Sequence, residues 1–160
     1  MYEENKDAIT HEGLKNLQQQ IIKLQEEIKR LGLLVQKAKS YGDLRENSEF
    51  QSAAADLRNT EIQIEHINSI IQRCTVVRIR EQKEYIDFGA YVTMRNDNKI
   101  HKYQIVGDCE SNIDDGKMTI KSLLAKAILG KKAGDIVETN INKIKKTWEI
   151  LEVHYIIEND

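Results

Sequence analysis

Two stretches of coiled-coil spacing occupy most of the first half of the chain and restrict what it can fold into. In each stretch, apolar residues recur at alternating intervals of three and four. The first seam comprises Leu14, Leu17, Ile21, Leu24, Ile28, Leu31 and Val35, and the second comprises Phe50, Ala53, Leu57, Thr60, Ile64, Ile67, Ile71 and Cys74. A short break containing Gly42 separates them. The spacing therefore predicts two helices of similar length that pack as an antiparallel hairpin.

The ends of the two helices carry recognisable capping residues. Thr10 is the predicted N-cap of the first helix. At the turn, Asp43 precedes the second helical pattern and Glu46 follows three residues later, which is close to a capping box. Glu49 then lies where the helix dipole favours negative charge. On one interpretation these acids do nothing more than start the second helix at Asp43.

A second interpretation uses the position of the same acids at the end of a long arm. In a helix that starts at Asp43, the carboxylates of Asp43 and Glu46 are neighbours and can share a divalent cation such as Mg²⁺. Another macromolecule would supply the remaining ligands, while Asn47 adds a donor and an acceptor and Phe50 anchors the turn on the seam. An exposed carboxylate has several lone pairs, so capping and metal binding are compatible.

The second half of the chain changes to the period of strands. Alternation from Ile86 to Met94 predicts a strand, and residues 96–99 predict a turn into a returning strand that includes Ile105. Further predicted elements are a short strand around Met118 and Ile120 and a helix from Leu123 to Leu129 capped by Ser122. The last strand is predicted from Trp148 to Tyr155. Its inward-facing positions shift by one residue, which predicts a bulge. The predicted fold class is α+β, with a hairpin over residues 1–76, its acidic tip at 40–50, and a mainly antiparallel sheet domain over 77–160.

Composition excludes several classes of function. The net charge of -2, with no strongly basic half, argues for weak autonomous nucleic-acid binding at most. No apolar run has membrane-spanning length, and the acidic, polar start is unlike a signal peptide. Cys74 and Cys109 are far apart and are predicted to be unpaired, which favours a reducing cytoplasm, and the four dispersed histidines argue against a structural zinc site.

The tip and several other segments together resemble one known family. Residues 42–50, GDLRENSEF, resemble the tip signature of the GreA/GreB family of bacterial transcript-cleavage factors. Residues 8–17 resemble the family's opening of the first helix, and residues 88–92, 105–107, 131–135 and 148–155 follow in the family's order. The continuation FQSAA after the tip is closer to GreA than to GreB. The resemblance spans nearly the whole chain.

The resemblance implies a fold, a partner and a reaction. The globular domain would be FKBP-like, and the coiled coil would enter the secondary channel of bacterial RNA polymerase while the globular domain docks at the channel rim. The polymerase then hydrolyses the 3′ end of a backtracked nascent RNA, so the protein is an accessory factor rather than an enzyme. It binds no cofactor alone and shares Mg²⁺ with the polymerase active site through Asp43 and Glu46, with Asn47, Ser48, Glu49 and Phe50 as tip support.

Two of the departures from the family pattern bear on function. The basic patch that helps retain the RNA 3′ end is represented thinly, by Lys37, Lys39, Arg45 and Arg58, which favours short cleavage products. The chain has no proline, and Leu123 stands where the family usually has one in the loop that docks on polymerase.

Three alternative functions deserve comparison with cleavage stimulation. The protein can be a channel-binding inhibitor of polymerase without cleavage activity, although the intact Asp43 and Glu46 argue against this. A prolyl isomerase needs an apolar, aromatic pocket, for which the second half offers few aromatic residues. A purely structural coiled coil does not explain the match of the second half to a two-domain family.

Overall fold

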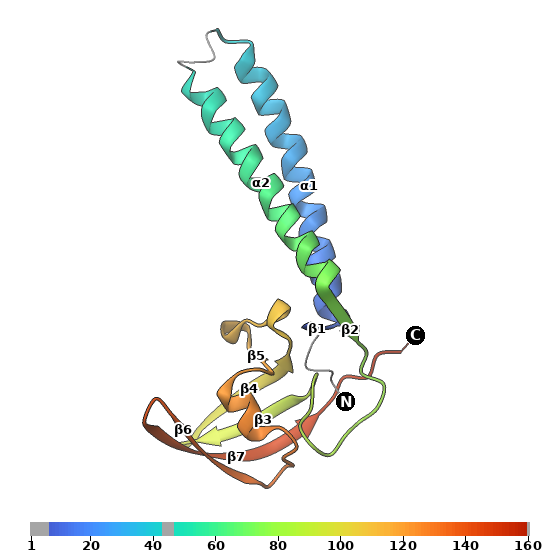
Figure 1. The fold of residues 1–160 in the computed structure, drawn as a ribbon, viewed down its shortest axis with the longest axis vertical. Coiled ribbons are helices and arrows are strands. Elements are labelled where there is room, and N and C mark those ends of the chain that lie inside the picture. Colours follow the sequence, from blue (N-terminus) through green and yellow to red (C-terminus); the bar gives the residue numbers. More distant parts are fainter. Residues whose placement is uncertain (1–6, 43–46, 160) are drawn as a thin grey trace. The chain divides into compact units, whose positions relative to one another are not determined.

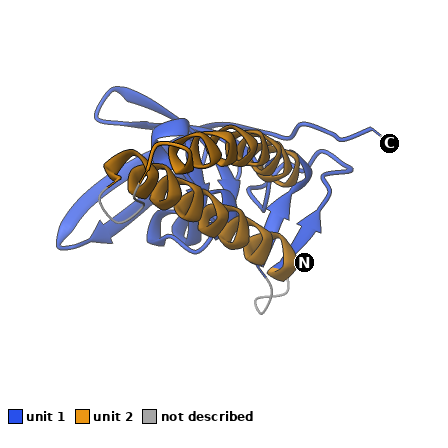
Figure 2. Cartoon of the chain, turned by 90° about the horizontal axis from the view of Figure 1, so that it is seen from above, with its two compact units in different colours: residues 1–13, 74–160 blue, residues 14–73 orange. Residues whose placement is uncertain are grey.

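The computed structural model describes residues 7–42 and 47–159 of the 160-residue chain. Asp43, Arg45 and Glu46 therefore lie outside the described residues. The chain forms two compact units, one of residues 14–73 and one of residues 1–13 with 74–160 (Figure 2). The predicted α+β class is confirmed, because long helices in the first half are followed by a sheet. The predicted domain boundary after residue 76 remains a prediction.

The first half contains the predicted helical hairpin. Helix α1 spans His11–Lys39 and helix α2 spans Ser48–Arg73, and the two run side by side in opposite directions (Figure 1). Members of both seams are buried or half-buried. The most buried side chains of the hairpin are Leu17, Leu31, Ala38, Thr60 and Ile67. Ala38 extends the first seam by one further step, three residues beyond Val35.

The start of α1 agrees with the sequence, whereas the start of α2 does not. Thr10 is buried, and its Oγ1 accepts a hydrogen bond from the Gly13 N–H at 3.0 Å, so the predicted cap is confirmed. The predicted start of the second helix at Asp43 is wrong, because α2 begins at Ser48 and its cap is Asn47. Asparagine and aspartate are about equally good caps, so residue type alone does not choose between them.

The second unit is built on a five-stranded sheet in the order β5-β4-β3-β7-β6 (Figure 1). Its strands are β3 Tyr91–Asn96, β4 Lys99–Val106, β5 Lys117–Thr119, β6 Ile136–Ile141 and β7 Ile144–His154. All neighbouring pairs are antiparallel except β4 and β5, which are parallel. The sheet is therefore mixed, although mainly antiparallel as predicted.

Smaller elements complete this unit. Strands β1 Asp7–Thr10 and β2 Cys74–Val77 form a separate parallel pair. Two 3₁₀ turns, η1 Asp108–Glu110 and η2 Ile113–Asp115, connect β4 to β5. Helix α3 spans Leu123–Ile128, and the predicted cap is confirmed because Ser122 Oγ accepts from the Ala125 N–H at 3.1 Å.

The turn and the bulge predicted in the sheet are both present. Asp97 and Asn98 have φ values of 47° and 61° between β3 and β4, the geometry of a tight hairpin turn. On the other side of β3, Thr93 pairs with Glu152 while Met94 pairs with Ile150, so one residue of β7 is extra at the bulge. With this bulge, the chain buries Trp148 and Ile150 of β7 and then Tyr155, which directly follows the strand.

The predicted strand from Ile86 is wrong over its first half, because β3 starts only at Tyr91. Ile86, Phe88 and Ala90 are nevertheless buried. Gly89 has a φ of 85°, which interrupts an extended strand, and its N–H donates to Ile105 O at 2.7 Å. Alternating burial here comes from a loop that packs on the core. Strand β6, which the sequence did not predict, is the edge strand beyond β7.

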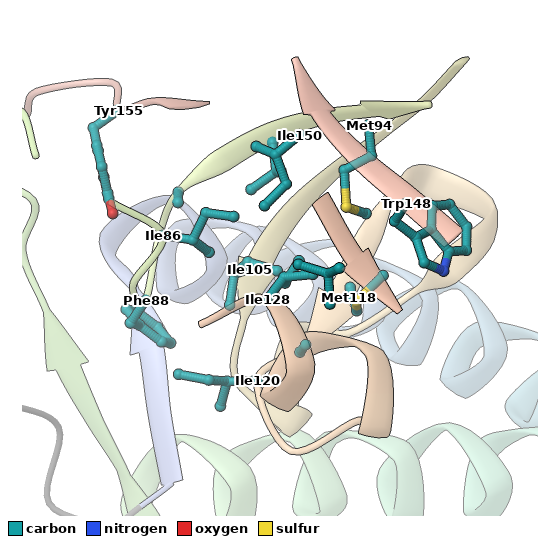
Figure 3. Packing of buried hydrophobic residues seen from close by; sticks show 14 of the residues in the cluster. Ile86, Phe88, Met94, Ile105, Met118, Ile120, Ile128, Trp148, Ile150 and Tyr155 are labelled. Carbon is teal, nitrogen blue, oxygen red and sulfur yellow. The ribbon is translucent and has the colours of Figure 1, made fainter. Parts of the chain in front are cut away.

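The core of the second unit lies between the sheet and the segments that cover it (Figure 3). Ile128 of α3 belongs to one apolar cluster with residues of the sheet, namely Met94, Ile105, Met118 and Ile150. This single apolar cluster fixes α3 against the sheet.

The prediction of two unpaired cysteines is wrong. Cys74 and Cys109 form a disulfide across 35 residues of sequence. No local sequence motif predicts this disulfide. Cys74 lies at the start of β2 and Cys109 lies in η1, and only the tertiary fold brings these two segments together. Among the described residues, no helix is long and apolar enough to cross a membrane.

Candidate functional site at the hairpin tip

The tip of the hairpin is closed by one side chain that links the two helices. Asn47 Nδ2 donates a hydrogen bond to the main-chain carbonyl of Ala38 at 2.7 Å. The same carbonyl accepts from the Tyr41 N–H at 3.2 Å. The last carbonyls of a helix have no partner within the helix, so this one is satisfied from both sides of the turn.

Asn47 also starts α2. Its Oδ1 accepts from the Phe50 N–H at 3.1 Å, and its main-chain carbonyl accepts from the Gln51 N–H at 3.1 Å. One residue therefore caps α2 and ties it to the end of α1. Asp43 and Glu46, the predicted carboxylates, lie outside the described residues.

The other predicted tip-support residues differ in environment. Ser48 and Glu49 are exposed on the first turn of α2. Phe50 is half-buried, and Lys39 Nζ lies 5.9 Å from the centre of its ring, within the range of a cation–π contact. Lys39 is thus placed against Phe50.

A groove of about 1270 Å³ lies between the helices next to the tip. Among its lining residues are Arg30, Leu34, Lys37, Tyr41, Glu49 and Asp56. Its walls carry charges of both signs. Tyr41, which the sequence analysis did not single out, is 64% exposed here despite its large ring. An aromatic residue directly before the turn glycine was the available signal.

The predicted basic patch is only partly assembled. Lys37 lines the groove, whereas Arg58 is exposed on α2 away from the groove lining, and Arg45 lies outside the described residues. Arg30, which the sequence analysis did not single out, is the second basic residue of the groove, and its Nε donates to Glu27 Oε2 at 2.8 Å. Sequence alone does not separate such a residue from others on the polar side of the helix.

Within the part of the chain that the structure describes, no group of three or more histidine, cysteine, aspartate or glutamate side chains is arranged to hold a metal. Glu49 is the acid of the described tip that faces the groove beside Asn47 and Ser48. Mg²⁺ commonly takes one or two protein carboxylates and obtains its other ligands elsewhere.

The fold and the tip define a class of protein: a helical hairpin with an anchored polar turn, continuous in sequence with a small mixed-sheet unit. Residues 8–76 match the family described as "Transcription elongation factor, N-terminal", and residues 81–155 match the family described as "Transcription elongation factor, GreA/GreB, C-term". The chain belongs to the GreA/GreB family of transcription elongation factors, as its tip and segment order indicated.

Full-length relatives agree with this assignment. The transcription elongation factor GreA of Mesorhizobium japonicum is 32% identical over 156 residues, which cover 95% of this chain and 99% of the relative. The GreA of Neorickettsia sennetsu is 34% identical over 151 residues, covering 92% of this chain and 95% of the relative. A crystal structure of GreA factor homolog 1 from Thermus thermophilus aligns with 94% of this chain and 99% of its own, at 21% identity and a TM-score of 0.44.

Proposed function

We propose that this protein binds bacterial RNA polymerase and stimulates the polymerase's own hydrolysis of backtracked nascent RNA. The hairpin enters the secondary channel, the sheet unit docks at the channel rim, and the 3′ end of the RNA meets the tip. The protein is an accessory factor, and the reaction takes place in the polymerase. Membership of the GreA/GreB family and the polar, anchored tip support this proposal.

The observation that carries the proposal is the double role of Asn47. Carboxylates that complete a metal site in another molecule must arrive in a defined position, since disorder at the tip costs entropy on binding. The bond from Asn47 to Ala38 and the cap on Phe50 fix the chain on both sides of the turn. A turn that only connects two helices does not need both.

Asp43 and Glu46 would hold the shared Mg²⁺ together with acids of the polymerase. When bound, the ion lowers the pKa of a coordinated water and neutralises charge on the phosphodiester. Lys37 and Tyr41, which line the groove beside the tip, are positioned to contact the RNA phosphate and base. The mixed charge of the groove gives weak RNA retention, so short cleavage products are expected.

The test uses a stalled, backtracked polymerase carrying 3′-labelled RNA, with the release of short fragments followed at several Mg²⁺ concentrations. Asp43→Asn and Glu46→Gln remove the proposed metal ligands. Glu65→Gln makes the same change of charge at an exposed position well along α2 and is the matched control. Circular dichroism verifies that each variant keeps its helices.

Faster cleavage with the wild type and Glu65→Gln, lost in both tip variants while they still compete for the channel, supports the proposal. No stimulation at saturating protein contradicts it. Slower elongation without cleavage in the same reactions would instead assign the protein to the channel-binding inhibitors.

A further inference from the structure

The short turn η1 contacts both chain segments through which the helical hairpin joins the sheet unit. The Glu110 carboxylate accepts hydrogen bonds from Thr10 N at 2.7 Å and from Thr10 Oγ1 at 2.8 Å. Its neighbour Cys109 forms the disulfide with Cys74. In sequence, Thr10 directly precedes α1 and Cys74 directly follows α2. Two adjacent side chains of η1 therefore hold the entry and the exit of the hairpin.

Contacts other than the disulfide also hold η1. Asp108 accepts hydrogen bonds from Lys121 Nζ, at 2.8 Å, and from the Thr119 hydroxyl. On its other side, Gly107 packs so closely on β1 that an added Cβ would lie 1.8 Å from Ala8 O. The cysteine of η1 is thus placed near Cys74 by contacts other than the disulfide.

Both cysteines are within reach of a solute. Cys74 and Cys109 are each only partly buried, and Thr75 and Val76, which follow Cys74 in β2, are exposed. The rate of thiol–disulfide exchange depends on the access of the attacking thiolate to the sulfurs, and a partly exposed pair allows that access. The surroundings of this pair therefore suit reversible chemistry.

We propose that Cys74 and Cys109 form a reversible dithiol–disulfide switch whose oxidation clamps the exit of the hairpin to η1. The oxidant is a low-molecular-weight disulfide of the glutathione type. This inference goes beyond the proposed function and does not depend on it.

The chemistry proceeds by two thiol–disulfide exchanges. One cysteine loses its proton, and the thiolate attacks a sulfur of the small disulfide, forming a mixed disulfide and releasing one small thiolate. The second cysteine, also deprotonated, then attacks the protein sulfur of the mixed disulfide, forming the Cys74–Cys109 bond and releasing the second small thiolate. The protein loses two protons and two electrons, and the small disulfide is reduced to two thiols.

The two states differ in how the end of α2 is held. In the reduced state, β2 is retained by its pairing with β1, in which Cys74 lies opposite Asp7. Oxidation adds a covalent link across 35 residues, which restricts the unfolded chain and suppresses local opening of β2. The entry at Thr10 is held by Glu110 in both states, so the switch acts on one root of the hairpin.

The experiment equilibrates the full-length protein in buffers with different ratios of reduced to oxidised glutathione. Free thiols are trapped by alkylation and counted by mass spectrometry, and the same samples are analysed by thermal unfolding and amide hydrogen exchange. We expect a single two-electron transition to an intramolecular disulfide. We also expect the oxidised protein to melt about 10 °C higher and its β2 amides to exchange roughly tenfold more slowly.

Cys74→Ser with Cys109→Ser removes the couple and is expected to show neither transition nor dependence on the glutathione ratio. The single variant Cys109→Ser can form only a mixed disulfide, so it is expected to gain one glutathione without the rise in melting temperature. Two free thiols at every ratio would overturn the proposal. So would oxidised and reduced wild type with equal melting temperatures and equal exchange at β2. Neither result depends on cleavage activity.

Discussion

The side chain of Asn47 donates to the main-chain carbonyl of Ala38, at a distance of 2.7 Å, and so joins the start of α2 to the end of α1. The other end of the same amide caps α2 through the Phe50 N–H. The two bonds use opposite chemistry, one a donor and one an acceptor, and the amide carries these two functions on different atoms. This combination makes the contribution of each bond separable by substitution.

Asn47→Ala removes both bonds and is expected to destabilise the hairpin by about 1 to 2 kcal/mol. Asn47→Asp keeps an acceptor for the cap but replaces the donor with a negative oxygen facing a carbonyl. We expect it to show faster exchange of the Tyr41 amide, whose partner is the same carbonyl, while the Phe50 amide stays protected. Hydrogen exchange measures both. Equal loss of protection at both amides in the aspartate variant would contradict the separate roles.

Gly107 and Gly32 form a matched pair for alanine substitution. At Gly107 an added Cβ would lie 1.8 Å from Ala8 O, a main-chain atom of β1, although the φ of -82° is ordinary. At Gly32, inside α1, an added Cβ meets nothing within 4 Å. Gly107→Ala is therefore expected to cost about 3 kcal/mol or more, and Gly32→Ala to stabilise by roughly 0.5 to 1 kcal/mol. Urea unfolding measures both changes in stability. Similar effects of the two substitutions would show that the room available for a Cβ does not determine the change in stability.

Thr139 accepts a hydrogen bond from the indole N–H of Trp148, at 3.2 Å within the core. Thr139→Val keeps the shape but leaves that N–H without this acceptor, so we expect a loss of about 1 to 2 kcal/mol in the free energy of unfolding. Thr139→Ser keeps the hydroxyl and is the control, with a smaller loss from the missing methyl. Trp148 is the single tryptophan, so its fluorescence follows unfolding in urea. If Thr139→Ser were less stable than Thr139→Val, the methyl group would contribute more to the free energy of unfolding than the hydrogen bond does.

The hairpin could be predicted from the sequence because its packing depends on apolar residues at alternating intervals of three and four, which is the spacing of a coiled coil. Its tip could be predicted only in part. Asp43 and Asn47 are both suitable caps by residue type, and what selects Asn47 is a bond to Ala38, nine positions earlier on the other helix. The spacing of Asp43 and Glu46 made them candidate Mg²⁺ ligands, and the family resemblance favoured this interpretation over capping alone.

In the sheet unit, patterns of burial were predicted more reliably than the elements that carry them. Alternation identified Ile86, Phe88 and Ala90 as core residues, but Gly89 and its bond to Ile105 keep them in a loop. The sequence pattern did not predict strand β6, because the strand buries Val137 and the polar Thr139 and exposes the apolar Ile136. The disulfide could not be predicted because it depends on the packing of η1, which is set by contacts distant in sequence.

The last prediction concerns alkaline pH and Tyr155. The hydroxyl of this residue is buried, donates to Tyr85 O at 2.7 Å and accepts from the Asp87 N–H at 2.9 Å. Burial, together with the nearby charge of Asp87, raises the pKa of Tyr155 to about 12 from an ordinary value of 10.0. The folded protein therefore keeps this proton over a range in which the unfolded chain has lost it.

Because the folded-state pKa is the higher one, the stabilisation is complete below pH 10 and is lost as the pH rises toward 12. Two pKa units correspond to roughly 2 to 3 kcal/mol. Tyr155→Phe, which has no proton to lose, is expected to be less stable than wild type at pH 9 and to lose that disadvantage as the pH approaches 12. Urea unfolding across this range measures the difference, with Tyr85→Phe, at an exposed ring, as the control. A constant difference between wild type and Tyr155→Phe would show that Tyr155 does not control alkaline unfolding.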